Sequence, residues 1–219
     1  MENKTEIRFG GFFLILGALI TIICILLEVD EGWASLVVEM NRTDYEAGKF
    51  LFEHWQNMSV IWNWSLFGNV FLAIASILLI RQTIKIGWFP SSLFWSIHFI
   101  GSLLLIVSFA ICLGSYYNAL SLIDDKLYLF ETIRGIPLYL FNIGALFQLS
   151  SLIIYFQQGF SKDGIVPRSF AFMTLLVIVI AFLLIVFGLV SFAVFAIACF
   201  LAPLLLGIFF TKVSLTESQ

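Results

Sequence analysis

Five long segments of this chain carry no Asp, Glu, Lys or Arg, and the longest runs for 43 residues from Ser169 to Thr211. The four others cover residues 9–27, 54–80, 86–123 and 135–161. Nearly all charged side chains lie in the intervals between these segments. A soluble domain of this size cannot bury so much apolar surface, whereas a helix that crosses a bilayer requires about 20 predominantly apolar residues. The pattern therefore predicts an integral membrane protein.

The lengths of the charge-free segments predict an all-α, polytopic membrane protein with six transmembrane helices in one domain. The segment from Ser169 to Thr211 is too long for one span, so we expect two helices joined by a tight turn near Gly188–Ser191. Composition agrees, because 11% of the 219 residues are charged, against about 25% in soluble proteins. The predicted spans cover residues 10–28, 59–80, 91–115, 136–156, 170–188 and 191–210.

The basic residues predict the orientation of the chain. Seven lie in the N-terminal segment, after the second span, after the fourth span and in the C-terminal tail, and four lie on the opposite side. Short loops rich in Lys and Arg stay in the cytoplasm, so we expect a multi-pass protein of the cell membrane with both termini cytoplasmic. Glu28-Val-Asp-Glu31 follows the first span where a signal peptide would have a small-residue cleavage site. We therefore interpret that span as a retained helix.

The loop of residues 29–58 is the only sizeable segment predicted outside the membrane. Within it, Thr43-Asp-Tyr-Glu46 has the pattern of a capping box, in which the Glu46 side chain reaches back to the Thr43 backbone. Apolar residues at helical spacing follow this box, with polar residues on the opposite face. We expect a short amphipathic helix that covers the outer end of the bundle or serves as a lid over a ligand. In the fourth span, Pro137 is expected in the first turn.

Six polar side chains in the predicted spans are the candidate site residues, because each lowers stability in lipid unless its polar atoms are satisfied. Two interpretations remain open: the residues line a small cavity, or they hydrogen-bond between helices. His98 is the one whose unperturbed imidazole has a pKa near neutral pH, and we expect it to be neutral and hydrogen-bonded. We also expect a kink at Pro203, and any site among spans two to four and the outer loop. The six are Asn63, Asn69, His98, Ser102, Asn142 and Gln148.

The sequence offers little support for catalysis, metal binding or nucleic-acid binding. It contains no hydrolase, metalloprotease or phosphate-loop motif, so we expect neither an enzyme nor a cofactor. Two histidines are too few for a histidine-rich metal site. A net charge of −3 without a basic patch argues against nucleic acid. Small residues on one face of spans one and three, including Gly10, Gly17 and Gly101, predict close helix packing or a homodimer face.

Short motifs mark the ends of several predicted spans. Gly10-Gly11 starts span one, the long outer loop follows it, and Leu79-Ile-Arg-Gln82 ends span two. Gly164-Ile-Val-Pro167-Arg168 and Leu206-Gly207 come later, and Ser169 separates Arg168 from the aromatic Phe170. Apart from this position of Ser169, the layout resembles a bacterial six-helix membrane family known as domain of unknown function 4386. The resemblance implies a bacterial cytoplasmic membrane and assigns no activity or functional residue.

Two functional hypotheses follow from these observations. The first is a non-enzymatic membrane protein whose polar faces on spans two to four bind a lipid or small ligand, or a membrane partner. The second is a small-molecule transporter or channel, in which Asn69, His98, Asn142 and Gln148 line a path and Pro203 acts as a hinge. Transport predicts a water-accessible cavity that reaches the middle of the membrane.

Overall fold

The computed structural model describes residues 2–33, 43–85, 89–162, 164–189 and 192–212. This part of the chain contains helices and no strand, which confirms the predicted all-α class. The helices are α1 (Glu2–Asp30), α3 (Asp44–Glu53), α4 (Trp55–Lys85), α5 (Phe89–Leu120), α6 (Leu127–Gln148), α7 (Ser150–Phe160), α8 (Arg168–Val186) and α9 (Phe192–Lys212).

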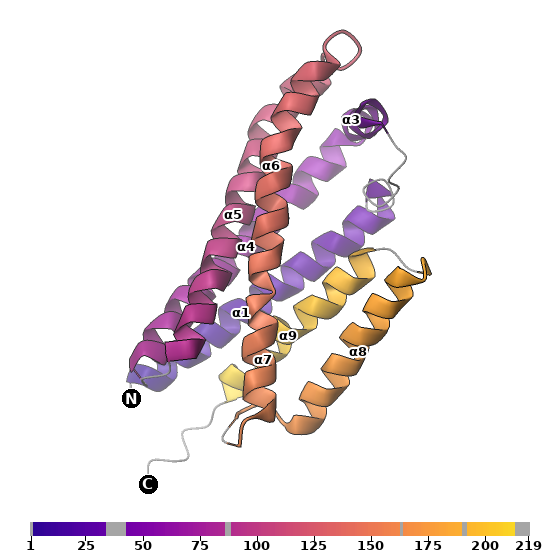
Figure 1. The fold of residues 1–219 in the computed structure, drawn as a ribbon. Helices are drawn as coiled ribbons and strands as arrows, with labels where there is room; N and C mark the ends of the chain where they lie inside the picture. The colour runs from indigo at the N-terminus through magenta and orange to yellow at the C-terminus, as the bar shows by residue number, and fades with distance from the viewer. Residues whose placement is uncertain (1, 34–42, 86–88, 163, 190–191, 213–219) are drawn as a thin grey trace.

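Six helical segments of the described chain are long and apolar enough to cross a membrane, with α6 and α7 counted as one segment. The chain is therefore a multi-pass membrane protein in a lipid bilayer. Most of the helices are longer than the spans predicted for them. The 32 residues of α5, for example, exceed the roughly 20 needed to cross the hydrocarbon, so this helix continues beyond it. The start of α1 and the end of α9 lie at the same end of the bundle, which we call the end where the termini lie, and α3 lies at the other (Figure 1).

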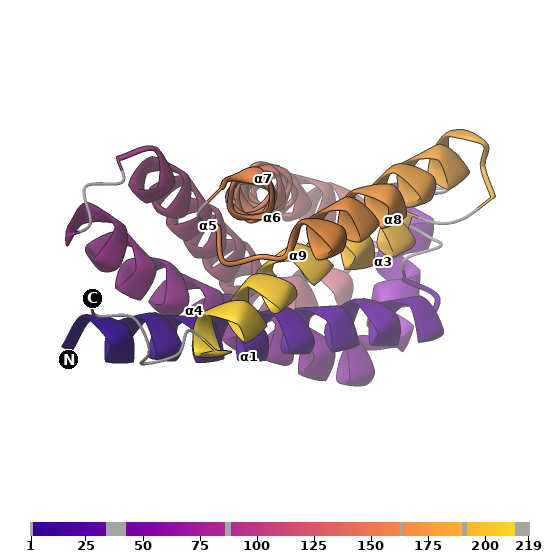
Figure 2. The same ribbon diagram turned by 90° about the horizontal axis from the view of Figure 1, so that it is seen from below.

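The spans form an incomplete ring in the order α6, α5, α4, α1, α9 and α8. Each helix packs along its neighbour in this order, and α9 lies between α1 and α8 (Figure 2). At the end of the bundle where the termini lie, α7 contacts α8 and α9 and closes the ring. At the end near α3 the ring is open between α6 and α9, because α6 packs along α5 and α9 packs along α1.

Paired glycines bring the backbones of neighbouring helices close together at three places in the ring. A Cβ added to Gly101 of α5 would lie 2.8 Å from the Gly144 carbonyl oxygen of α6, and one added to Gly144 would lie 2.9 Å from the Gly101 oxygen. The same reciprocal approach joins α1 to α4 and α1 to α9. The predicted small-residue faces are therefore used within one chain, and they give no support to a homodimer face. The other two pairs are Gly17–Gly68 and Gly11–Gly207.

The longest charge-free segment divides into α8 and α9, as expected from its length. Gly188, just after α8, has a φ of +68°, a conformation that glycine adopts without steric strain. Its backbone N–H donates to the Ile185 carbonyl at 2.8 Å, and the Leu189 N–H donates to the Leu184 carbonyl at 2.8 Å. These two bonds form a Schellman motif, which ends the helix and starts the turn. Residues 190–191 of the predicted turn lie outside the described residues.

The amphipathic helix predicted in the outer loop is present as α3. Its capping box is confirmed, because the Thr43 N–H donates to Glu46 Oε2 at 2.9 Å and Thr43 Oγ1 accepts from the Glu46 N–H at 3.3 Å. Gly48 and Leu51 are buried on the face toward α5 and α6, so α3 covers this end of the bundle. Tyr45 donates to the Asp124 carboxylate at 2.7 Å, and this bond raises the pKa of the exposed Tyr45.

The fourth span starts earlier than expected and is interrupted near its middle. Pro137 is in the interior of α6 rather than in its first turn, because the helix begins at Leu127, within the interval that carries charges. The prediction for Pro137 is therefore wrong. At Leu149 the backbone N–H donates to the Leu146 carbonyl at 3.2 Å, a tighter turn than in an α-helix. This turn separates α6 from α7 (Figure 1).

The contact between α5 and α6 gives a test of the glycine packing. Replacing Gly101 with Ala places a methyl group against the Gly144 backbone, which has to move, and we expect a loss of about 1–3 kcal/mol of stability. Gly114→Ala in the same helix is the matched control, because no atom lies within 4 Å of an added Cβ there. Unfolding titrations of both variants in detergent micelles measure the difference. Equal stabilities of the two variants would contradict the packing argument.

Candidate functional site

A groove between α6 and α9 is the candidate site. It consists of two adjoining cavities of about 270 Å³ and 250 Å³ that share Phe141, Ala145 and Gln148 of α6. Helices α1, α4 and α5 form the floor of the larger cavity. We call the two cavities together the α6–α9 groove. Its larger part is lined mainly by apolar side chains, with polar groups from Thr21, Glu28, Ser65, Asn69, Ser108, Arg134 and Gln148.

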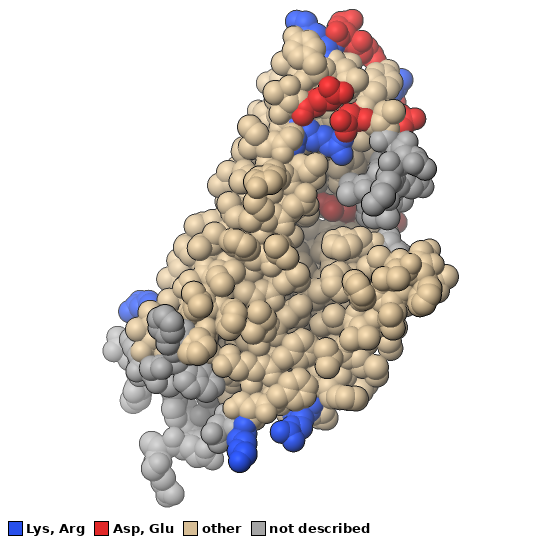
Figure 3. Space-filling model, viewed as in Figure 1, with Lys and Arg blue, Asp and Glu red and all other residues tan. Residues whose placement is uncertain are grey.

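The groove opens on the side of the bundle, where the ring of helices is incomplete. Leu138 and Phe141 of α6 and Phe192 of α9 line it and are 43%, 41% and 57% exposed. Figure 3 shows the molecule hollowed between the α5–α6 side and the α8–α9 hairpin, with acidic atoms inside the recess. The residues that border the opening on this flank are therefore apolar, as is typical of surface that faces lipid.

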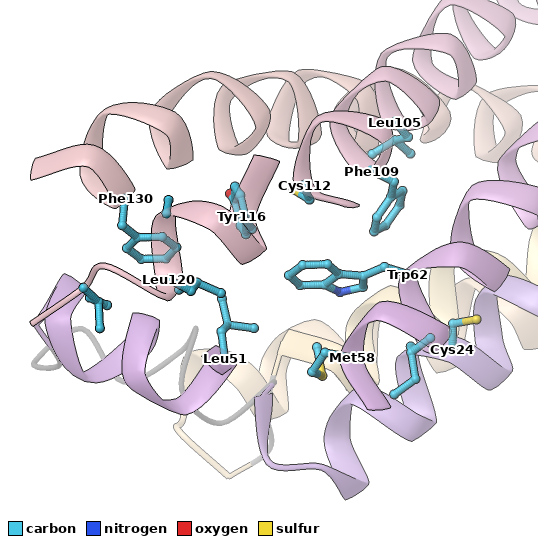
Figure 4. Close-up of a cluster of buried hydrophobic side chains, with 13 residues drawn as sticks. Cys24, Leu51, Met58, Trp62, Leu105, Phe109, Cys112, Tyr116, Leu120 and Phe130 are labelled. Carbon is cyan, nitrogen blue, oxygen red and sulfur yellow. The ribbon is translucent and has the colours of Figure 1, made fainter. Parts of the chain in front are cut away.

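At the α3 end, the groove holds a carboxylate among aromatic rings. Glu28, in the last turn of α1, is partly buried and accepts a hydrogen bond from Trp62 Nε1 at 3.0 Å. The Trp62 indole extends from α4 toward α5 and meets Tyr116 edge to face, with ring centroids 5.9 Å apart (Figure 4). Trp33 lies against the same indole at 6.1 Å. All four side chains line the groove.

Arg134 of α6 also lines this end of the groove, and its charge is already paired. The guanidinium forms an ion pair with Asp44 of α3 and lies 5.9 Å from the centre of the Phe130 ring. It forms no ion pair with Glu28. Arg134 therefore connects the groove wall to the helix that covers the bundle end.

At its deep end, the groove meets a buried hydrogen-bond network. Gln148 Nε2 donates to Asn69 Oδ1 at 2.8 Å and to Ser102 Oγ at 3.3 Å, which joins α6 to α4 and α5. Asn69 Nδ2 donates to the Ser65 carbonyl at 2.8 Å, and Ser102 Oγ donates to the His98 carbonyl at 3.0 Å. The side chains of Asn69 and Gln148 thus both hold the helices together and line the groove.

His98 is fully buried, and its imidazole is hydrogen-bonded to α4. Ser76 Oγ lies 2.8 Å from His98 Nδ1 and 2.8 Å from the Leu72 carbonyl oxygen. His98 Nε2 has no hydrogen-bond partner among the described residues. Trp95 packs edge to face against the ring at 5.6 Å. His98 does not line the groove.

The structure brings four of the six candidate residues close together and separates the other two. Four of them lie in or next to the buried network: Asn69, His98, Ser102 and Gln148. Asn69 and Gln148 fit both interpretations made from the sequence, because they line the cavity and also hydrogen-bond between helices. Asn63 is exposed and donates to the Ser59 carbonyl of its own helix at 2.8 Å.

The remaining two residues singled out from the sequence lie at the smaller cavity. Asn142 is exposed and lines this cavity, away from the network. Pro203 is buried inside α9 and lines the same cavity. The predicted kink at Pro203 stays a prediction.

Sequence reasoning missed Glu28 and Arg134 because it placed Glu28 at the end of the first span and counted Arg134 among the basic residues between spans. It also confined the site to spans two to four and the outer loop, whereas α1 and α9 line the groove as well. A helical stripe was available as a signal on α6, because its groove-lining residues recur every three or four positions and include Arg134 and Gln148. The full stripe is Arg134, Pro137, Leu138, Phe141, Ala145 and Gln148.

The groove has no metal-binding constellation, and comparison with known proteins adds no assignment. Within the described residues, no three His, Cys, Asp or Glu side chains gather closely enough to hold a metal ion. No family model matches the chain, and no curated protein or solved structure matches it either. The resemblance to domain of unknown function 4386 therefore stays a prediction.

The contact between Asn69 and Gln148 can be measured with a double-mutant cycle. Asn69→Ala, Gln148→Ala and the double variant should give a coupling energy of about 0.6–1.7 kcal/mol, as found for other interhelical hydrogen bonds in membranes. Asn63→Ala is the control, since Asn63 bonds only within α4, and it should not couple to Gln148. Unfolding of the variants in mixed micelles measures the energies. A coupling near zero for Asn69 and Gln148 would contradict a structural role for this bond.

Proposed function

We propose that this protein is a non-enzymatic, multi-pass membrane protein that binds a single-chain amphipathic lipid in the α6–α9 groove. The observation that carries the proposal is the form of the groove: apolar walls, a charged end near α3, and an open flank toward lipid. Ligand sites are typically apolar clefts with a few polar groups that fix orientation. An amphiphile has the same distribution of polar and apolar surface, and it can enter from the bilayer without crossing water.

The length of the groove suits one acyl chain. Arg134 and Gln148 lie on the same stripe of α6, 14 positions apart, which corresponds to about 21 Å along a helix axis. Half of the hydrocarbon core measures about 15 Å. A ligand with its headgroup near Glu28 and Arg134 would therefore extend to about the middle of the membrane, where Asn69 and Gln148 end the larger cavity.

The proposed location is the cell membrane, with α3 on the outer side and both termini in the cytoplasm. The excess of Lys and Arg at the end where the termini lie supports this orientation, because basic loops are retained in the cytoplasm. The ligand would then come from the outer leaflet. A bacterial source, a homodimer and a membrane partner remain expectations from the sequence.

Absence of catalysis is part of the proposal. Glu28 is the acidic group of the groove, and its hydrogen-bond partner is the Trp62 indole, which cannot exchange a proton with it. Hydrolytic chemistry needs a nucleophile and a base within hydrogen-bond reach. The Cys112 thiol lies beside the Tyr116 hydroxyl in the groove, but a neutral phenol is not a base, so these two lining residues do not form such a pair.

Transport is the second candidate, supported by a cavity that reaches the buried network in the middle of the bundle. A path would have to continue between the network and the end where the termini lie. That region is filled by a second core cluster, which includes Leu14, Leu72 and Trp95, each at most 1% exposed. Binding in the groove requires no opening of this core, and we therefore place binding before transport.

Blocking the groove tests the proposal. Ala145→Phe adds a ring to the wall that both cavities share, and we expect about tenfold weaker binding of a single-chain probe, equivalent to about 1.4 kcal/mol. The probe is a photoactivatable monoacylglycerol with a diazirine in its chain, added to the purified protein in nanodiscs. Mass spectrometry of the crosslinked peptides locates it.

A matched variant separates groove binding from general contact with lipid. Ala110→Phe adds the same ring to an exposed position of α5 that does not line the groove, and labelling of the groove peptides should persist. Equal labelling of groove and α8 peptides in the original protein would overturn the proposal. Uptake of the probe across sealed vesicles containing the protein would favour transport instead.

A further inference from the structure

We infer that the α3 end of the groove binds a positively charged headgroup, so that the ligand is a cationic or zwitterionic amphiphile. This inference rests on the proposed function and specifies the chemical class of the ligand. It depends on the Glu28 carboxylate, on the pairing of Arg134, and on the aromatic rings around them.

Glu28 has the means to hold a cation. Among the described residues its carboxylate accepts one hydrogen bond, from the neutral Trp62 indole at 3.0 Å, and it has no basic partner. A carboxylate has about four lone-pair positions, so acceptor capacity remains toward the groove. A charge next to apolar walls is unfavourable unless an opposite charge or donors compensate for it. A bound ammonium group would supply that opposite charge.

Arg134 does not reverse the preference for a cation, because Asp44 already neutralises the charge of its guanidinium. The guanidinium is in an ion pair with the Asp44 carboxylate and its side chain is 22% exposed. An anionic headgroup would have to compete with Asp44 for Arg134 and would also meet the negative charge of Glu28. At this end of the groove, Glu28 is therefore the ionisable side chain for which the described residues provide no partner of opposite charge.

The aromatic rings near Glu28 favour an organic cation over a small inorganic one. Trp33, Trp62 and Tyr116 line the groove together with the carboxylate. Their rings meet edge to face, at 6.1 Å for Trp33 with Trp62 and 5.9 Å for Trp62 with Tyr116. Aromatic faces attract alkylammonium groups through the ring quadrupole, and tryptophan does so best. A carboxylate beside such rings combines an opposite charge with the aromatic contacts that attract substituted ammonium groups.

The apolar part of the ligand would follow the α6 stripe away from Glu28. Leu138, Phe141 and Ala145 continue the wall toward the middle of the membrane, and Ala196 of α9 faces them across the groove. A headgroup without a chain would leave these surfaces uncovered. The geometry therefore points to an amphiphile rather than to a water-soluble amine.

Four probes with the same dodecyl or lauroyl chain test the headgroup preference. They are dodecyltrimethylammonium, lauroyl lysophosphatidylcholine, monolauroylglycerol and laurate, each radiolabelled. Equilibrium binding is measured in nanodiscs of digalactosyldiacylglycerol, whose headgroup is uncharged, and empty nanodiscs correct for partitioning. We expect dodecyltrimethylammonium to bind about tenfold more tightly than monolauroylglycerol, and laurate to bind most weakly.

Glu28→Gln should lower the affinity for dodecyltrimethylammonium to within about twofold of the affinity for monolauroylglycerol. The affinity for monolauroylglycerol itself should not change. Glutamine keeps an acceptor for Trp62, so the fold should be retained. Glu31→Gln is the matched control, because Glu31 accepts from Asn57 at 2.8 Å and does not line the groove. It should leave all four affinities unchanged.

The outcomes separate this inference from the proposed function. Binding of lysophosphatidylcholine as tight as that of dodecyltrimethylammonium would support the inference and identify a zwitterionic lipid as the source. Equal binding of all probes, unchanged by Glu28→Gln, would overturn the inference and leave lipid binding in place. Tighter binding of laurate than of dodecyltrimethylammonium would overturn the inference and indicate that Arg134 recognises an anionic headgroup. Binding of none of the probes would overturn both.

Discussion

Close contact between helix backbones at paired glycines is the constraint on which the arrangement of the bundle depends. Lipid is as apolar as the helices, so burial of apolar surface does not drive one helix against another inside a membrane. Van der Waals packing and interhelical hydrogen bonds do so instead, and both require surfaces that approach closely. Gly17 with Gly68, and Gly11 with Gly207, attach α4 and α9 to opposite sides of α1. Gly101 with Gly144 attaches α6 to α5 in the same way.

The same three contacts explain why the ring stays open at one place. Two of them attach α9 to α1 and α6 to α5, and no glycine pair joins α6 to α9. The ends of these helices near α3 consequently diverge, while α7 closes the ring at the other end. Bulky side chains such as Phe141 and Phe192 line the gap, so the two backbones remain apart. The groove is therefore a consequence of where close packing is absent.

The sequence predicted the elements whose signals are local. Charge-free length indicates a span, Thr43 with Glu46 forms a capping box within four residues, and Gly188 ends α8 through bonds to the preceding turn. The groove depends on which helices become neighbours, and neither periodicity nor charge determines that. Glu28 and Arg134 are far apart in the chain, and each resembles an ordinary residue at a span end. Their meeting at one cavity follows from the ring of helices.

The buried network and the groove place different demands on the same residues. Gln148 uses both hydrogens of its amide nitrogen to hold α4 and α5, and Leu149 next to it interrupts the helix. With both amide hydrogens in use, Gln148 has no donor left for a ligand, so the deep end of the groove limits chain length and offers no charged partner to a headgroup. Recognition then falls to the α3 end, where Glu28 retains acceptor capacity. This difference between the two ends would fix the direction in which an amphiphile lies.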